Sequence, residues 1–164
     1  MMAASLRDAV TDLINREAML IDDKRFEDWL ELYAEDCLVW MPAWQSESEL
    51  TDDPHGALNL LYLTPRSRLE DRVFRLESGD SFASTPMDRT VHVVSNIAII
   101  AERGEEIDAR AHWIVHSYGT HGGITRGGRY EYTLRREGEA LRIAKKKIVM
   151  INDKLIGAVD IYHI

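Results

Sequence analysis

The chain has 164 residues, of which 45% are hydrophobic and 29% charged, a composition typical of one soluble globular domain rather than of a disordered chain or two independent cores. Its 28 acidic residues outnumber its 20 basic ones, and the net charge of -8 argues against nucleic acid as a partner. The longest uncharged apolar stretch, residues 38–44, is far shorter than the roughly 20 residues that cross a bilayer, so we expect no membrane span.

The first predicted element is a helix over residues 6–21. Apolar residues recur there at helical spacing behind Ser5, whose hydroxyl is suited to cap the first turn together with Asp8. No basic segment followed by an apolar one precedes this helix, so we expect a cytoplasmic protein rather than a secreted one. Asp22 and Asp23 supply a second cap and predict a short second helix. Its expected apolar face comprises Phe26, Trp29, Leu30 and Tyr33.

A buried strand is predicted over residues 37–41, because this run is apolar and rich in aromatic and β-branched residues and Pro42 stops it. Cys37 is the only cysteine, so it cannot form an internal disulfide, and a buried packing role is expected. The acidic residues 45–54 are expected to form an exposed loop. At the rim of this loop Met41, Pro42 and Trp44 form a candidate surface for a partner protein. The alternative is that Trp44 folds back over the chain's own helices.

Residues 58–63 fit a short strand or a helical lead-in, and Pro65 opens a third predicted helix. The expected apolar side of this helix comprises Leu69, Val73, Phe74 and Leu76. Several arginines crowd the same helix, and we expect them to pair with acidic residues on neighbouring turns. These expected partners are Glu70, Asp71 and Glu77.

From Arg89 onward apolar residues alternate with a period of two, which predicts four long strands joined by turns. In the first of them, residues 91–100, both parities are largely apolar, so we expect cover on much of both faces and a homo-oligomer, most simply a trimer. Residues 107–117 form the second strand. The pairs Gly122-Gly123 and Gly127-Gly128 are assigned to a loop before the third strand, whose face comprises Tyr130, Tyr132 and Leu134.

The fourth strand changes parity along its length. Leu141 and Ile143 share one face, whereas Ile148 and Met150 fall on the other, so we expect a bulge within the lysine run 145–147. The three lysines are assigned to a solvated edge or to this bulge.

Helices followed by hairpin-linked strands indicate an α+β fold in one domain, residues 1–164. Because strands this long must twist and curl, we expect a cone-shaped half-barrel of curved antiparallel sheet wrapped on the N-terminal helices. A pocket is possible in its concavity.

The chemistry of the sequence is mainly one of exclusions. A Rieske cluster needs two Cys and two His, and this chain has one Cys. His112 and His116 are spaced by four residues on a strand, hence about 13 Å apart, too far to chelate one metal, and a surface or hydrogen-bonded role is expected. No G-x-S-x-G elbow or phosphate loop occurs. We therefore expect no catalytic, cofactor-binding or metal-binding residues in this chain.

Five segments resemble the small (beta) subunit of bacterial aromatic-ring-hydroxylating dioxygenases, and together they span nearly the whole chain. They are residues 29–36 (WLELYAED), 40–44 (WMPAW), 69–76 (LEDRVFRL), 88–97 (DRTVHVVSNI) and 160–163 (DIYH). The Met-Pro-Ala-Trp segment before an acidic loop and the Ala-Lys-Lys run of the last strand are most similar to the benzoate, toluate and anthranilate branch.

The resemblance implies the cone fold shared with nuclear transport factor, ketosteroid isomerase and scytalone dehydratase. It also implies a structural, non-catalytic role. The partner large (alpha) subunit would hold the Rieske iron-sulfur cluster and the ferrous iron, and a separate reductase would pass on electrons from NADH. A homotrimer of small subunits would pack beneath the large subunits in a hetero-hexamer. The implied reaction inserts both atoms of O2 into an arene carboxylate such as benzoate, giving a cis-dihydrodiol carboxylate.

Two other functions stay open on the residues alone. The first is a stand-alone isomerase or dehydratase acting on a small hydrophobic ligand, with His92 and either Asp88 or Asp108 as acid and base in the concavity. The second is a ligand-binding module without chemistry. A neighbouring gene that encodes Rieske and iron-ligand motifs would favour the dioxygenase subunit over both.

Overall fold

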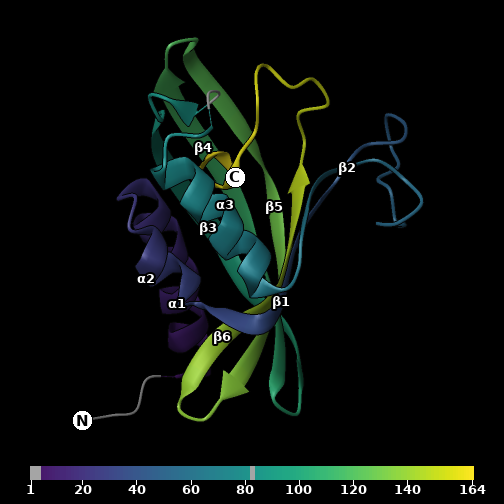
Figure 1. The fold of residues 1–164 in the computed structure, drawn as a ribbon. Helices are drawn as coiled ribbons and strands as arrows, with labels where there is room; N and C mark the ends of the chain where they lie inside the picture. Colours follow the sequence, from purple (N-terminus) through teal and green to yellow (C-terminus); the bar gives the residue numbers. More distant parts are fainter. Residues whose placement is uncertain (1–4, 82–83) are drawn as a thin grey trace.

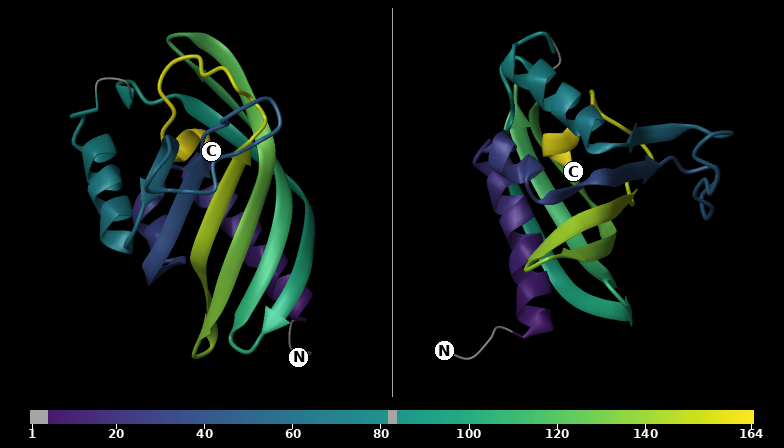
Figure 2. Two further views of the ribbon diagram at one scale, coloured as in Figure 1. Left: turned by 90° about the vertical axis from the view of Figure 1, so that its right-hand side faces the viewer. Right: turned by 60° about the horizontal axis from the view of Figure 1, so that its bottom comes forward.

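The computed structural model describes residues 5–81 and 84–164. Its helices lie on one face of a six-stranded sheet with the strand order β2-β1-β6-β5-β4-β3, and the views in Figures 1 and 2 show how strongly that sheet curves. In chain order the elements are α1 (Leu6–Asp22), α2 (Phe26–Leu30), β1 (Tyr33–Pro42), β2 (Asn59–Leu63), α3 (Arg66–Glu77), β3 (Arg89–Arg103), β4 (Glu106–Gly119), β5 (Gly122–Glu137), β6 (Ala140–Met150) and the 3-10 helix η2 (Ile161–His163).

Helix α1 begins as the sequence predicts. The Ser5 hydroxyl accepts a hydrogen bond from the Asp8 amide at 3.2 Å, and the Asp8 carboxylate accepts one from the Ser5 amide at 3.1 Å, so the predicted capping box is confirmed. The helix lies across the inner face of the sheet (Figure 2, left) and contacts β3 and β6. Its buried side is apolar apart from one residue, Glu17.

Helix α2 differs from the prediction at both ends. Its N-cap position is Arg25, without a side-chain hydrogen bond, because the predicted cap, Asp22, instead accepts hydrogen bonds from β3. Tyr33 is the first residue of β1 rather than part of the helix. Strand β1 therefore begins at Tyr33 instead of Cys37, although it ends at Pro42 as expected.

The sheet is mixed rather than wholly antiparallel as predicted. Strand β1 pairs antiparallel with β2 but parallel with β6. After β2 and α3 the chain crosses to the far edge of the sheet and forms β3 there, and β4, β5 and β6 then lead back step by step until β6 lies beside β1. The intervening residues 45–54 form a largely exposed loop, as predicted. Of the two structures that the sequence allowed for residues 58–63, a short strand or a helical lead-in, the chain forms the strand, which is β2.

Strand β5 contains the glycines that the sequence assigned to a loop. It begins at Gly122, and Gly127 and Gly128 lie within it, paired with β4 and β6. A Cβ on Gly128 would lie 1.9 Å from the Val149 carbonyl oxygen, so a side chain is sterically excluded at this position. Gly128 therefore permits close approach of β6, and Gly127 permits that of β4, where its Cβ would lie 3.0 Å from the Trp113 carbonyl oxygen. Gly122, with φ +81°, follows the turn that joins β4 to β5, so for this glycine the predicted turn role is confirmed.

The predicted parity change in β6 is confirmed, one residue earlier than expected. Thr133 pairs with Lys145 whereas Leu134 pairs with Ile143, which leaves Ala144 as the extra residue of a bulge. Lys146 consequently shares the inner parity of Ile148 and Met150, and all three side chains are buried. Its assignment to a solvated edge or bulge is wrong, and only Lys145 and Lys147 retain exposed surface.

Helix α3 begins after Pro65 and buries Leu69, Val73 and Leu76, as predicted. Phe74 is wrongly assigned, because it is 69% exposed. Two arginines of this helix pair within it, Arg66 with Glu70 and Arg68 with Asp71. Arg72 instead donates to Asp160 at 2.8 Å, which ties the helix to the segment before η2.

One connected hydrophobic core fills the space between the helices and the inner face of the sheet. Trp113 of β4 stacks on Tyr130 of β5 at its centre, with the ring centroids 5.3 Å apart. The opposite, outer face of β3 is open in the single chain, where Val91 and Val93 are 51% and 55% exposed. The cover that the sequence predicts for this face stays a prediction about a homo-oligomer. None of the helices in the described ranges has the length and apolarity that a membrane crossing requires.

Candidate functional site

The interior of the cone contains a charged cluster centred on Glu17 of α1. One Glu17 oxygen, Oε1, accepts hydrogen bonds from the Tyr33 hydroxyl and from Lys146 Nζ, the latter at 2.8 Å, and Oε2 accepts one from the Tyr132 hydroxyl at 2.8 Å. The side chains of Glu17 and Lys146 are only 3% and 6% exposed. Lys146 Nζ also lies 4.1 Å from the ring centroid of Tyr130. Every oxygen of the buried carboxylate is thus occupied by a donor.

The electrostatics of this cluster favour a fixed ion pair. Burial alone would raise the pKa of Glu17, but the charge and hydrogen bond of Lys146, together with the two tyrosine hydroxyls, lower it below its usual value of 4.5. Burial raises the pKa of Tyr33 and Tyr132 well above the usual value, and the neighbouring carboxylate raises both further. The carboxylate therefore stays ionised and the hydroxyls stay protonated near neutral pH.

A second polar group, Asp22 with His92, lies beside this cluster. Asp22 Oδ1 is 2.6 Å from His92 Nδ1, and Asp22 Oδ2 accepts the His92 amide at 2.8 Å. The Thr90 hydroxyl also donates to Oδ1 at 2.8 Å. Burial would raise the pKa of Asp22, yet these hydrogen bonds, that of the His92 ring above all, lower it. The ionised carboxylate fixes Nδ1 of the imidazole as the donor.

This arrangement corrects the acid-base pair expected from the sequence. His92 does lie in the concavity, but its partner is Asp22 rather than Asp88 or Asp108. Asp88 contacts His163 Nε2 at 3.2 Å, and Asp108 accepts from Arg103 and from Thr133 on the outer face. The space beside His92 is a cavity of about 10 Å³, which is too small for an organic substrate.

The sequence carried signals for both interior groups. Glu17 occupies the position in the α1 stripe of Val10, Ile14 and Ile21 where an aliphatic residue is expected. Lys146 has the parity of Ile148 in β6. A charged residue of opposite sign at a core position on each of two elements predicts a buried ion pair. This signal was missed because Lys146 stands in a run of three lysines, which is typical of an exposed segment.

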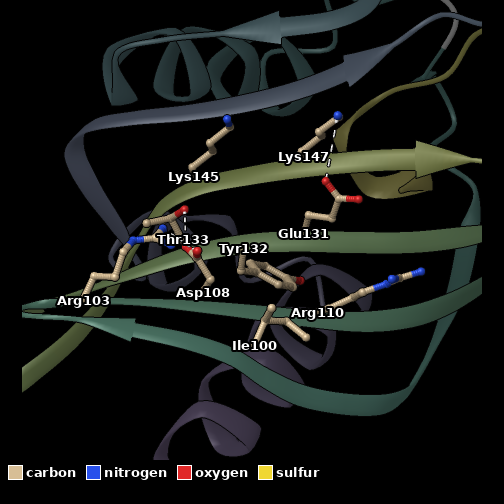
Figure 3. Close-up of a pocket in the computed structure, with 9 residues that line it drawn as sticks. All are labelled: Ile100, Arg103, Asp108, Arg110, Glu131, Tyr132, Thr133, Lys145 and Lys147. Atoms are coloured by element: carbon tan, nitrogen blue, oxygen red, sulfur yellow. Dashed lines mark hydrogen bonds and ion pairs between the residues drawn. The ribbon is translucent and has the colours of Figure 1, made fainter. Parts of the chain in front are cut away.

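The outer face of the sheet has a different character (Figure 3). An open groove of about 480 Å³ crosses β3 to β6 on this face. Four of its six charged side chains pair with one another, Lys147 with Glu131 at 3.9 Å and Arg103 with Asp108, whereas Arg110 and Lys145 form no ion pair with the described residues. The groove lining is Ile100, Arg103, Asp108, Arg110, Glu131, Tyr132, Thr133, Lys145 and Lys147. Such a wide, open, charged surface suits contact with another protein better than catalysis.

Beside this groove the outer face of β3 and β4 carries exposed apolar side chains among polar ones such as His112 and His116. Val91 pairs with His116 and Val93 with Ile114 across the two strands. The apolar members are half exposed or more, and they are Val91, Val93, Ile100, Ile114 and Tyr118. We call these five residues the outer apolar patch.

The candidate contact residues at the acidic loop occupy three different environments. Met41 is fully buried and Pro42 is buried. Trp44 is partly exposed, and its indole N–H donates to the Met150 carbonyl at 2.7 Å. Trp44 thus packs over the end of β6 rather than over the helices, and it alone of the three presents surface to a partner.

The remaining candidates show no grouping for metal or nucleophile chemistry. His112 and His116 face outward and hydrogen-bond with Asn96 and Thr125. Across residues 5–81 and 84–164, no three His, Cys, Asp or Glu side chains are placed to share a metal ion. Cys37 is buried, and burial raises the pKa of its thiol to about 12, which leaves it unreactive.

Residues 16–156 match the family model described as "Ring hydroxylating beta subunit". The chain belongs to this family. The small subunit of 2-halobenzoate 1,2-dioxygenase from Burkholderia cepacia is 39% identical over 94% of each chain. Toluate 1,2-dioxygenase subunit beta from Pseudomonas putida is 38% identical over 96% of this chain and 97% of that one.

Solved structures agree with this membership. The beta subunit of benzoate 1,2-dioxygenase from Burkholderia mallei has a TM-score of 0.80 at 34% identity and full coverage of both chains. An NTF2-like protein from Novosphingobium aromaticivorans, at 19% identity and a TM-score of 0.62 over 90% of this chain and 83% of that one, shares the fold alone. The predicted α+β cone and its family are therefore confirmed, and this ring-hydroxylating beta subunit is part of an oxidoreductase of the benzoate and toluate type.

Proposed function

We propose that this chain is the non-catalytic structural subunit of a Rieske non-heme iron dioxygenase that cis-dihydroxylates an aromatic carboxylate of the benzoate type. The observation that supports this most strongly is the similarity to halobenzoate and toluate dioxygenase subunits along nearly the whole chain. The closed interior, where the acid-base groups pair with one another, agrees with a role without turnover. We take residues 1–164 as a single domain, in keeping with the one connected core.

In this proposal the large subunit supplies the redox groups. It would hold the Rieske cluster and the ferrous iron, and a separate reductase would deliver electrons from NADH. With a single cysteine, this chain cannot hold a Rieske cluster itself. A supply of NADH also places the assembly in the cytoplasm.

The small subunits are proposed to form a homotrimer through the outer apolar patch. Half-exposed aliphatic side chains side by side on two long strands are a surface that association would cover. The charged groove next to the patch would supply the polar rim of such an interface. Three small and three large subunits would then form a hetero-hexamer.

Trp44 is proposed as a contact for the large subunit, with Met41 and Pro42 supporting it from beneath. Its ring is partly exposed at the edge of the acidic loop while its N–H is tied to Met150. A large ring held in place in this way loses little conformational freedom on binding, which suits an anchor.

Co-expression with the large subunit of a dioxygenase of the benzoate or toluate type tests the proposal. We expect the two to co-purify and the complex, with its reductase and NADH, to convert benzoate to a cis-dihydrodiol carboxylate with consumption of O2. An assembled complex that acts on unsubstituted hydrocarbons but on no aromatic carboxylate would contradict the substrate class. Failure to associate with any large subunit would contradict the proposed role.

A further inference from the structure

Five buried side-chain polar atoms have no hydrogen-bond partner within the described residues. They are Nε1 of Trp29 and Trp113, Nε2 of His92, and the hydroxyls of Tyr130 and Tyr162. Of these five residues, only His92 and Tyr130 line a cavity together. The His92 side chain is 3% exposed and Tyr130 is 1% exposed. Because a polar group at this depth is costly to leave unpaired, the two atoms indicate a shared, unassigned partner in that cavity.

Both residues line the same cavity. It measures about 10 Å³ and is bounded by α1, β3, β5, β6 and the C-terminal residue. Its lining is Glu17, Ala18, Ile21, His92, Tyr130, Lys146 and Ile164. A single water molecule needs about 10 to 15 Å³ and two to four polar partners. The cavity therefore has the size and the lining for one water and for nothing larger.

The protonation of the two groups defines how such a water would bind. The ionised Asp22 carboxylate can only accept, so Nδ1 of His92 is the donor, and in the tautomer that carries this one ring proton Nε2 has a lone pair that can accept from water. Burial raises the pKa of Tyr130, so its hydroxyl keeps its proton and can donate. The pair thus offers one acceptor and one donor, which complement the donor and acceptor of water.

We propose that the cone interior of this subunit is a one-water binding site, in which an ordered water donates to His92 Nε2 and accepts from the Tyr130 hydroxyl. The Asp22–His92 pair then serves to orient this water and to satisfy the core. The site does not take an arene, because Trp113, Tyr130, Tyr132 and the Glu17–Lys146 pair already fill the concavity. This inference concerns the interior of the chain and stands whether or not the proposed substrate class is right.

A crystal structure of the full chain, alone or with its large subunit, tests the site at a resolution that shows ordered water. We expect one water peak within hydrogen-bond reach of both atoms, and loss or displacement of that peak in Tyr130→Phe. Tyr132→Phe is the matched control, because its hydroxyl bonds to Glu17 and does not line the cavity; its peak should stay in place. A direct His92–Tyr130 hydrogen bond, an absent peak, or a peak unchanged in Tyr130→Phe would overturn the proposal.

A solution measurement keeps the proposal testable if Tyr130→Phe does not fold. Nitrogen-15 chemical shifts of the His92 ring in the unaltered chain should show a protonated Nδ1 and an unprotonated, hydrogen-bonded Nε2. A proton on Nε2 would contradict the assigned direction of the hydrogen bond and overturn the site as described.

Discussion

On the inner face of the sheet, polar groups are scarce and the charged ones form specific pairs, whereas on the outer face polar and apolar groups lie open beside one another. The inner face places Glu17 against Lys146 and Asp22 against His92. The outer face leaves Val93 half exposed next to a charged groove. Both faces belong to the same long strands, so folding of the single chain completes the inner side, and the outer side is the one that we propose for assembly.

The largest expected effect comes from breaking the buried ion pair. Lys146→Met leaves the Glu17 carboxylate buried without its cation, which should lower the free energy of unfolding by about 3 to 5 kcal/mol. Lys147→Met is the control on the same run, since its Nζ lies on the outer face 3.9 Å from Glu131; it should cost less than about 1 kcal/mol. Urea unfolding of the two variants measures the difference, and equal losses would contradict the inner-face assignment.

The next effect concerns the close approach of β5 and β6. In Gly128→Ala the new methyl meets the Val149 carbonyl oxygen at 1.9 Å, and the strands must separate at a cost of about 3 kcal/mol. In Gly123→Ala the nearest atom is Cε1 of the His116 ring at 3.0 Å, a side chain that can turn aside. Thermal melting should therefore fall strongly only for Gly128→Ala.

On the outer face the expected loss is in association rather than in folding. Val93→Glu places a charge in the outer apolar patch, which should weaken the homo-oligomer by about 2 kcal/mol or more while the monomer keeps its melting temperature. Sedimentation across a dilution series measures this. Met19→Glu makes the same change at a 65% exposed position on α1 and should leave the oligomer intact; dissociation by both variants would argue against the patch as the interface.

Trp44→Ala tests a residue that contributes to folding through its hydrogen bond to Met150 and that also has exposed surface for a partner. Loss of the hydrogen bond to Met150 should cost about 1 kcal/mol of folding stability. If Trp44 also contacts the large subunit, the variant should capture less of that subunit in a pull-down assay. Undiminished capture beside a lower melting temperature would assign Trp44 to folding alone.

The smallest effect is a pH dependence at the end of the chain. Burial lowers the pKa of His163 below its usual value of 6.5 despite the nearby Asp88. The folded state therefore disfavours the charged ring, and stability should be complete above pH 6.5 and decline as the pH falls through the lower folded-state pKa. His163→Gln should flatten this decline, whereas the exposed His121→Gln should not. A further decline below about pH 4.5, where Glu17 is protonated on unfolding, should persist in both variants.

The sequence predicted the elements with regular spacing and missed the contacts between distant ones. The α1 capping box, the inner parity of β4 and the parity change in β6 follow from local pattern, and the structure contains all three. The Asp22–His92 pair joins residues 70 positions apart, and no local pattern specifies that distance. Composition also misled where packing decides, since Gly127 and Gly128 were assigned to a loop, whereas they lie within β5 at close approaches to β4 and β6.

In the candidate site, the place of His92 in the concavity was predicted correctly, but its acidic partner was not, and the buried Lys146 was predicted to be solvated. Both errors have one cause. A charged residue is assigned to the surface by default, and only its parity within the strand or its place in a helical stripe indicates otherwise.

The central claim is that this chain supports a dioxygenase without carrying out its chemistry. Measuring iron content and benzoate-dependent O2 uptake for the chain alone, for the large subunit alone and for their complex tests it most directly. The account predicts iron only in samples that contain the large subunit, and full turnover only in the complex. Stoichiometric iron or turnover in the isolated chain would contradict it.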